Sequence, residues 1–253
     1  MSAEPKRPRA SAARAAPRRA EAGAGATPHR RAEPGPAGGR DRAPSSPERV
    51  ADAITKGVLR REWVVGQRLV ESNLTRQLGV GRSTVREALK ILASNGVVEL
   101  VPHRGAVIRG LSLADAESLL AVLEVLVGLA ARLAAERIGR GQNRQAFAAA
   151  ARPLIEPRPT DELDRILDER ARFYQAMLDV ADSEELRRAM PMPRAHIFRT
   201  QFHGFLSKSD LRAMVAEYRD IVRAVLAGDG PKAEAVARRH IRRTAERSLP
   251  HLR

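Results

Sequence analysis

Apolar residues recur at helical spacing from residue 47 onward, and this pattern predicts a mainly α-helical chain. Three helices are expected first, over about 47–61, 71–78 and 82–95, with Ser45 or Ser46 as the cap of the first. A glycine follows the second helix and can take the positive φ angle of a helix C-terminus. The apolar stripes are Val50, Ile54 and Val58 in the first helix, Leu74 and Leu78 in the second, and Val85, Ala88, Leu89 and Leu92 in the third.

Two short apolar runs follow the third helix, over 97–101 and 106–109. They flank the segment Pro102-His103-Arg104-Gly105, which predicts a β-hairpin with a short basic tip. A helix-turn-helix followed by two strands is a winged helix. His103 is either a pH-sensitive contact at this tip or an ordinary solvated loop histidine.

The rest of the chain predicts an antiparallel bundle of six or seven helices. Ser112 and Asp115 have the spacing of a capping box and open a helix that runs to about Ile138. Prolines and glycines mark the later breaks, and no alternating strand pattern is found. The further helices are expected near 142–152, 160–181, 183–190, 193–206, 209–227 and 231–247.

Charge is distributed unevenly along the 253 residues. The chain has 45 basic and 30 acidic residues, a net charge of +15, and 40 of the basic residues are arginine. Residues 1–46 contribute +6, residues 47–110 contribute +5, and residues 111–253 contribute +4. The excess suggests a polyanionic partner such as nucleic acid, although a GC-rich coding bias would produce the same skew.

Residues 1–46 contain no large aliphatic or aromatic side chain, so they predict a disordered basic tail. This tail either adds non-specific affinity for DNA or is a low-complexity extension. The composition therefore suggests three parts: the tail, a basic winged helix over 47–110, and a nearly balanced helical part over 111–253.

Several classes of protein are disfavoured by what the sequence lacks. It has no cysteine, which excludes disulfides, thiol catalysis and cysteine-ligated zinc. We find no run of about 18 apolar residues and no apolar core of a secretory signal, so a cytoplasmic protein without a membrane span is expected. An enzyme is poorly supported, because there is no phosphate-binding glycine loop, nucleophile elbow or His-Glu-x-x-His run.

The polar face of the third helix carries candidate DNA contacts. Arg82, Arg86 and Lys90 are four residues apart, and Ser83 and Thr84 stand in the first turn. Guanidinium groups can bond bidentately to guanine, while hydroxyl groups and the helix N-terminus can bind phosphates. By spacing alone, an ordinary amphipathic helix with a solvated basic face is the better explanation of the pattern.

The segment 47–110 resembles the GntR-family winged helix, which supports the DNA-binding interpretation. The resemblance rests on Gly66-Gln67-Arg68-Leu69, Glu71, Leu74, Leu78-Gly79-Val80, Arg82, Val85-Arg86-Glu87-Ala88-Leu89, Leu92, Gly96, Pro102-His103-Arg104-Gly105 and Val107. Gly81 departs from the usual serine or threonine cap, and Thr84 stands where proline is frequent. The resemblance implies DNA contacts from Ser72, Arg82, Ser83, Thr84, Arg86, His103, Arg104 and Gly105.

Residues 111–253 resemble the FCD effector domain of the FadR subgroup, more loosely. The matching stretches are Ala130-Ala131-Arg132-Leu133-Ala134-Ala135-Glu136-Arg137, Arg172-Phe173-Tyr174, Glu217-Tyr218-Arg219-Asp220-Ile221 and Gly228-Asp229. Such a domain dimerises and binds a small effector in its interior. Many hold a divalent metal, but the matching positions here are Arg170, Tyr174, Tyr218 and His240, of which only the histidine is a good ligand. We therefore expect no metal, with His196, His203 and His240 as the alternative ligand set.

The four replaced positions suggest a different ligand. Arg170, Tyr174, Tyr218 and His240 would surround one cation with hydrogen-bond donors, which suits a carboxylate or other anion. The alternative is that Tyr174 and Tyr218 are core residues tied by their hydroxyl groups.

These observations favour a homodimeric, ligand-responsive transcriptional regulator, expected to be a repressor that reads a palindromic operator in double-stranded DNA. The alternative is a non-specific or architectural DNA-binding protein, but coating DNA would not require a developed effector-like bundle.

Overall fold

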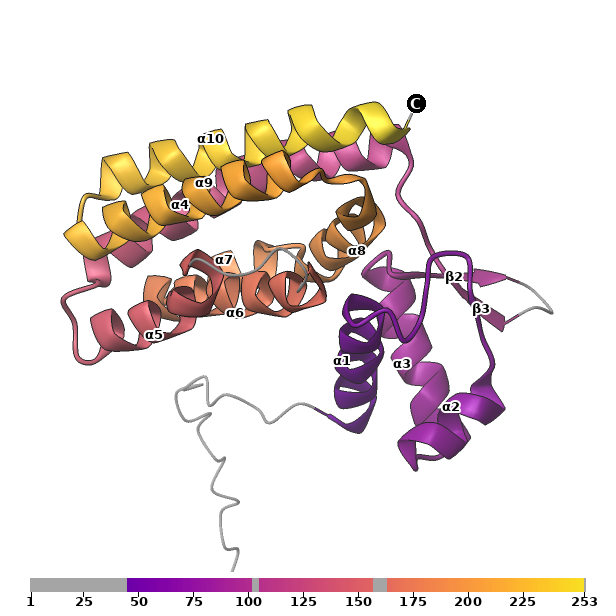
Figure 1. The fold of residues 1–253 in the computed structure, drawn as a ribbon. Helices are drawn as coiled ribbons and strands as arrows, with labels where there is room; N and C mark the ends of the chain where they lie inside the picture. The colour runs from indigo at the N-terminus through magenta and orange to yellow at the C-terminus, as the bar shows by residue number, and fades with distance from the viewer. Residues whose placement is uncertain (1–44, 102–104, 157–162, 253) are drawn as a thin grey trace, which may run out of the picture. The chain divides into compact units, whose positions relative to one another are not determined.

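The computed structural model of the protein describes residues 45–101, 105–156 and 163–252 (Figure 1). These ranges contain ten α-helices and three short strands, which confirms the predicted mainly helical fold with a winged helix before a helical bundle. The predicted tail up to residue 44 and the wing-tip residues Pro102, His103 and Arg104 lie outside the described residues.

Local capping signals define the three N-terminal helices. Ser45 caps the first through a capping box with Glu48, so the helix begins at Ser46, the last residue of the predicted tail. Gly79 ends the second in the left-handed region, at a φ of 64°. The helices are α1 (Ser46–Leu59), α2 (Glu71–Leu78) and α3 (Arg82–Ser94), and the fully buried side chains between them include Ile54, Leu74, Val85 and Leu92.

The winged helix has a third strand that the sequence pattern did not predict. Strand β1 (Arg68–Leu69) pairs with β3 (Gly105–Ile108), which also pairs with β2 (Val98–Val101), so the antiparallel order is β1-β3-β2. A strand of two residues is too short to show alternation, which explains why it was missed.

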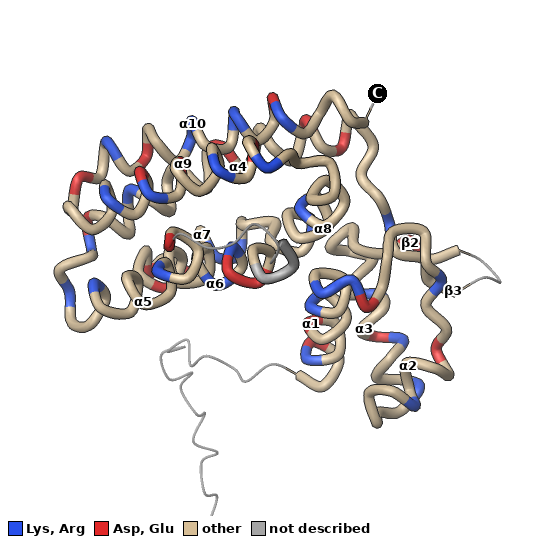
Figure 2. The backbone as a smooth tube through the Cα atoms, in the orientation of Figure 1, with Lys and Arg blue, Asp and Glu red and all other residues tan. Residues whose placement is uncertain are grey.

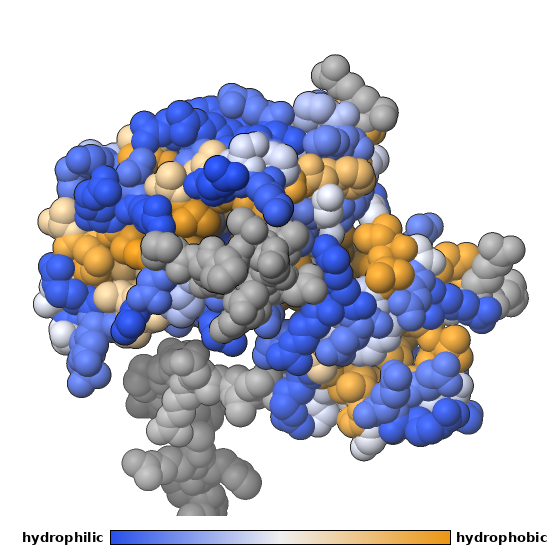
Figure 3. All heavy atoms as spheres, viewed as in Figure 1, coloured by the Kyte–Doolittle hydropathy of each residue, from blue (hydrophilic) through white to orange (hydrophobic). Residues whose placement is uncertain are grey.

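The second part of the described chain is a bundle of seven α-helices in two layers. Helices α4, α9 and α10 lie side by side in one layer, and α5 to α8 form the other (Figure 1). Hydrophilic residues cover the outer side of α10, where Lys and Arg recur (Figures 2 and 3). The bounds are α4 (Leu113–Arg137), α5 (Asn143–Ile155), α6 (Leu163–Ala181), α7 (Glu184–Ala189), α8 (Met192–Phe202), α9 (Lys208–Ala227) and α10 (Gly230–Ser248).

Two predicted helix ends were wrong. Helix α5 continues through Pro153, which was taken as a break, because Phe147, Ala151 and Leu154 are buried along one face and hold its last turn in place. Helix α8 ends at Phe202, and a 3₁₀ turn replaces its predicted last residues.

Helix α4 is long and apolar, although Glu124 and Arg132 interrupt it. By length and composition alone it could cross a membrane, with a mean hydropathy of 2.0 over 18 residues. Half of that stretch is buried inside the protein.

Helix α8 is tied to the chain where the winged helix ends. The Gln201 side chain accepts a hydrogen bond from the backbone N–H of Leu111 at 2.9 Å and donates one to its carbonyl at 3.1 Å. Arg194 of the same helix forms an ion pair with Asp115 at 3.1 Å. Both ends of α8 therefore contact the start of α4.

Gly57 of α1 allows the indole ring of Trp63 to approach, and a Cβ atom there would lie 2.1 Å from that ring. We expect Gly57→Ala to lower the free energy of unfolding by about 1–3 kcal/mol, because the steric clash outweighs the gain of about 1 kcal/mol in helix propensity. Urea unfolding followed by the fluorescence of this single tryptophan measures the change. Gly139→Ala, where a Cβ would meet open space, is the control. Equal stability of Gly57→Ala and the wild type would contradict the expected clash.

Candidate DNA interface and buried polar core

The first turn of α3 is open at its N-terminus. Gly81 occupies the cap position without a side-chain hydrogen bond, so no side chain satisfies the first N–H groups of this helix. Arg82 and Ser83 are exposed there and Thr84 is half-buried. The turn therefore presents backbone donors, hydroxyl groups and a guanidinium group together, as a phosphate and base contact requires.

Four of the predicted DNA contacts line one surface hollow of about 300 Å³. They are Ser72 from α2, Arg82 and Arg86 from α3, and Gly105 from the start of β3. Arg68 of β1 lines the same hollow and was not singled out by the sequence analysis. Its only signal was its place in the stretch that resembles the GntR family.

Arg86 is held by a neighbouring carboxylate. Its Nε atom lies 2.9 Å from Oε2 of Glu71, and both groups are substantially exposed. This ion pair joins α3 to α2, orients the Arg86 guanidinium group and partly neutralises its charge. The bond uses Nε and leaves the two terminal nitrogens of Arg86 available as donors. Arg86 is therefore a weaker source of positive charge than its spacing suggests.

The bundle brings the four predicted effector residues together. Arg170 and Tyr174 come from α6, Tyr218 from α9 and His240 from α10, and all four are buried. The Arg170 Nε atom donates to the Tyr218 hydroxyl at 2.9 Å, and the two tyrosine hydroxyls are 3.4 Å apart. The ring centroids of Tyr218 and His240 are 4.5 Å apart. The three helices thus bring the four side chains together in one cluster.

A second buried cation, Arg199 of α8, was not predicted. Its guanidinium carbon lies 4.4 Å from the ring centre of Tyr174, a cation–π contact. Arg170 and Arg199 are only 4% and 6% exposed. Burial, with repulsion from Arg170, lowers the pKa of Arg199, and burial raises the pKa of Tyr174. In the described part of the chain, the hydrogen bonds and ring contacts of both arginines are made with neutral groups.

One buried carboxylate, Glu217, joins α9 to α10. It accepts two hydrogen bonds from Arg247 at 2.9 and 2.8 Å, and its Oε2 lies 2.7 Å from Nδ1 of His240. Burial opposes its ionisation, but these donors outweigh burial and lower the pKa of Glu217 to about 2. Burial lowers the pKa of His240, so the neutral ring donates through Nδ1. Its Nε2 is buried without a hydrogen-bond partner among the described residues.

We call this cluster the buried polar core; its members are Arg170, Tyr174, Arg199, Glu217, Tyr218, His240 and Arg247. It does not fit a divalent metal, because its three arginines would repel the ion. The alternative histidine set is not assembled either: His196 contacts Arg199 at 3.4 Å, and His240 is bonded to Glu217. In the ranges the structure describes, no three His, Asp or Glu side chains are placed to hold a metal.

A small cavity of about 10 Å³ lies beside the buried polar core, with room for about one water molecule. Of the four predicted effector residues, only Arg170 lines it, so the free space lies toward α8 and the end of α10. Its lining is Arg170, Phe198, Arg199, Phe202, His203, Leu206, Met214, Thr244, Arg247 and Ser248.

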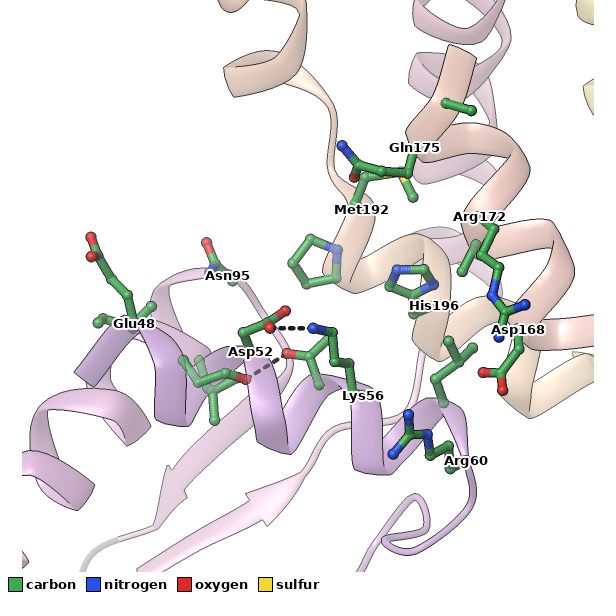
Figure 4. Close-up of a pocket in the computed structure, with 18 of the residues that line it drawn as sticks. Glu48, Asp52, Lys56, Arg60, Asn95, Asp168, Arg172, Gln175, Met192 and His196 are labelled. Carbon is green, nitrogen blue, oxygen red and sulfur yellow. Dashed lines mark hydrogen bonds and ion pairs between the residues drawn. The ribbon is translucent and has the colours of Figure 1, made fainter. Parts of the chain in front are cut away.

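A larger, open cleft of about 880 Å³ lies between α1 and helices α6 and α8 (Figure 4). On α1, Asp52 and Lys56 form an ion pair at 2.7 Å. His196 of α8 lines the opposite side, and burial next to Arg199 lowers its pKa to about 3. Helix α8 thus presents Met192, Pro193 and His196 to the cleft, and Arg199 to the buried polar core.

Comparison with known proteins agrees with this organisation. The model of the bacterial regulatory proteins of the gntR family matches residues 47–108, and the FCD domain model matches residues 118–243. A helix-turn-helix transcriptional regulator from an unstable DNA locus of Streptomyces ambofaciens is 27% identical over 190 residues, which cover 73% of this chain and 77% of the relative. The transcriptional repressor RspR of Escherichia coli K12 is 26% identical over 196 residues, covering 75% and 85%.

Among solved structures, E. coli McbR/YncC superposes with a TM-score of 0.70 at 17% identity, covering 81% of this chain and 97% of that one. This likeness shows a shared fold. The two domain matches and the open helix-turn-helix surface identify the chain as a DNA-binding transcriptional regulator that combines a gntR-family DNA-binding domain with an FCD domain.

Proposed function

We propose that this regulator is a cytoplasmic repressor of the FadR subgroup, which binds a palindromic operator as a homodimer and is controlled by a small carboxylate or other anion. An anionic effector is supported by the pair of buried guanidinium groups, Arg170 and Arg199. They lie beside a cavity and have no carboxylate partner in the described residues. Two buried cations need negative charge nearby, and a bound anion supplies it.

The cavity supports a site at the α8 side of the buried polar core. Arg170 can turn from the Tyr218 hydroxyl to a ligand, because a neutral hydroxyl is a weaker partner than a carboxylate. Arg199 reaches the same space from α8. The buried Nε2 of His240 adds one more polar atom without a partner in the described chain.

The anion site predicts that Arg170→Ala weakens effector binding by about 10- to 100-fold, the effect of one lost hydrogen bond between charged groups. Tyr174→Phe should weaken it less, because Tyr174 contacts the Arg199 guanidinium group and does not line the cavity. Calorimetric titration with a panel of mono- and dicarboxylates of three to six carbons identifies a ligand and measures the change.

The matched control is Arg212→Ala, an exposed arginine of α9 that should leave the affinity unchanged. Wild-type affinity in both Arg170→Ala and Tyr174→Phe would overturn the site. Circular dichroism of each variant separates a lost contact from a lost fold.

The alternative, an architectural DNA-binding protein, is disfavoured by the same core, because coating DNA requires no buried cation pair. A salt titration with an operator selected from random duplexes, against an unrelated duplex, distinguishes the two. A regulator should bind the operator much more tightly than the unrelated duplex even as the salt concentration increases, whereas an architectural protein should bind both duplexes alike.

A further inference from the structure

The positive charge of the bundle lies on two of its helices. Helices α9 and α10, with the two residues that join them, carry ten Lys and Arg against six Asp and Glu, a net charge of +4. This equals the whole excess of residues 111–253, so the rest of that stretch is balanced. Lys and Arg recur along both helices (Figure 2). The basic excess is therefore concentrated on this pair of neighbouring helices.

Four of these arginines are grouped near one carboxylate. Arg219 and Arg223 are four residues apart on α9, Arg239 and Arg243 are four residues apart on α10, and the two helices pack side by side. Asp220 lies between the helices, with its carboxylate oxygens 3.2 Å from Nη1 of Arg223 and 3.7 Å from Nη2 of Arg239. Residues four apart rise about 6 Å along a helix, and the axes of packed helices are about 8–10 Å apart. We call these four arginine side chains the arginine face.

The arginine face keeps much of its positive charge. Asp220 is shared by two guanidinium groups. Arg243 reaches Glu217 at 3.5 Å, but that carboxylate is already bonded inside the buried polar core, and Arg219 donates to a backbone carbonyl. The exposed Glu246 lies one turn beyond Arg243 on α10. Among the described residues of this surface, four guanidinium groups therefore outnumber the accessible carboxylates.

Exposed arginines of the other layer of the bundle are neutralised individually. Arg152 of α5 lies 2.6 Å from Glu156, and Arg188 of α7 lies 3.1 Å from Glu184 and 3.0 Å from Glu185. Each of these arginines has at least one exposed carboxylate of its own, which cancels its charge at short range. They provide a matched surface on which an anionic partner gains little.

We propose that the arginine face binds the phosphate backbone of a second DNA duplex while the winged helix holds the operator. Guanidinium groups bond phosphates through paired N–H groups, and duplex DNA presents about one negative charge per 1.7 Å of its length. The side chains of Arg223, Arg239 and Arg243 are 73%, 46% and 51% exposed, so their donors are accessible. Contacts to phosphates read no sequence, so the second duplex is bound whatever its base order.

The apolar residues of the surface favour DNA over a membrane as the partner. In the described parts of the chain, none of the large apolar side chains that are exposed lies on α9 or α10. A helix that binds a lipid surface inserts such side chains between the headgroups, whereas a phosphate backbone needs only the charged groups. The arginine face thus goes beyond operator binding and allows the regulator to bridge two DNA segments.

A bridging assay tests this surface. The operator is fixed to beads, the full chain is bound to it, and capture of a labelled, unrelated duplex is measured at about 50 mM salt. Arg239→Gln with Arg243→Gln should lower the affinity for the second duplex at least about 10-fold and leave operator affinity within about twofold of the wild type. The slope of log affinity against log salt should fall in magnitude by about 2, one for each lost phosphate contact. Arg152→Gln with Arg188→Gln removes the same charge from the other layer and should leave both affinities unchanged.

The outcomes separate the arginine face from the proposed function. Equal capture by the wild type and the α10 double variant would overturn the proposal, and so would equal losses in the α10 and control variants, which would show an effect of net charge alone. A wild type that captures no second duplex would overturn it and leave the regulator intact, because operator affinity is measured separately. Binding of anionic vesicles in place of the duplex, lost in the α10 double variant, would show a lipid-contact surface and overturn it as well. Circular dichroism confirms that each variant is folded.

Discussion

Replacing Glu217 with glutamine is expected to lower the free energy of unfolding by about 3 kcal/mol, the largest effect of any single substitution considered for this protein. The change removes the one carboxylate that pairs with Arg247 and His240, and it leaves the Arg247 guanidinium half-buried without its partner. Chemical denaturation at pH 7 measures the loss. Glu246→Gln, at an exposed position of α10, is the matched control and should change stability by less than about 0.5 kcal/mol.

The same substitution should remove a pH dependence. The pKa of Glu217 is about 2 in the folded protein against an ordinary value of 4.5, so the unfolded state binds the proton first as the pH falls. The stabilisation by this group is therefore complete above about pH 4.5 and is lost as the pH falls toward 2. The stability difference between wild type and Glu217→Gln should be constant above pH 5 and shrink below pH 4.5. A difference that is absent at pH 7 would contradict the ion-pair account.

Arg82→Ala is expected to reduce operator affinity by about 10- to 100-fold per winged helix, because a bidentate contact to a base contributes about 1–3 kcal/mol. Arg82 is exposed in the first turn of α3 and has no ion-pair partner within the described residues. Arg86→Ala should cost less, because Glu71 already neutralises part of its charge. Fluorescence anisotropy with the selected operator and an unrelated duplex measures both affinities.

The control is again Arg212→Ala, far along the chain on α9. A loss for Arg82→Ala that is equal on both duplexes would indicate a phosphate contact and contradict the base-reading role. An unchanged operator affinity would remove Arg82 from the interface altogether.

Much of the fold was predictable because its boundaries are set by local signals. The capping boxes at Ser45 and Ser112, and the left-handed glycines Gly79 and Gly228, fix helix ends through hydrogen bonds between near neighbours in sequence. Pro153 misled the prediction because tertiary burial of its helix outweighs one missing backbone hydrogen bond.

The candidate sites were predictable only in part. The four buried positions on α6, α9 and α10 come together as the resemblance to the FCD domain implied, because those helices are long and regular. Arg199 was missed because α8 has little amphipathic pattern, so its sequence does not show which side is buried. The bonds from Glu217 to His240 and Arg247 join residues 23 and 30 positions apart, and no local pattern encodes such pairs.

The nearly filled cavity beside Arg170 and Arg199 has a consequence for the timing and size dependence of the response. Space for one water cannot admit a carboxylate of several carbons, so such a ligand would enter only if a lining helix, such as α8, moved outward. Part of the binding free energy then offsets the cost of opening the cavity, and association is slower than diffusion allows. Larger anions would displace α8 further, and α8 is bonded through Gln201 to the residue that follows the winged helix. The size of the ligand, and not only its affinity, would then determine how far the DNA-binding domain is displaced.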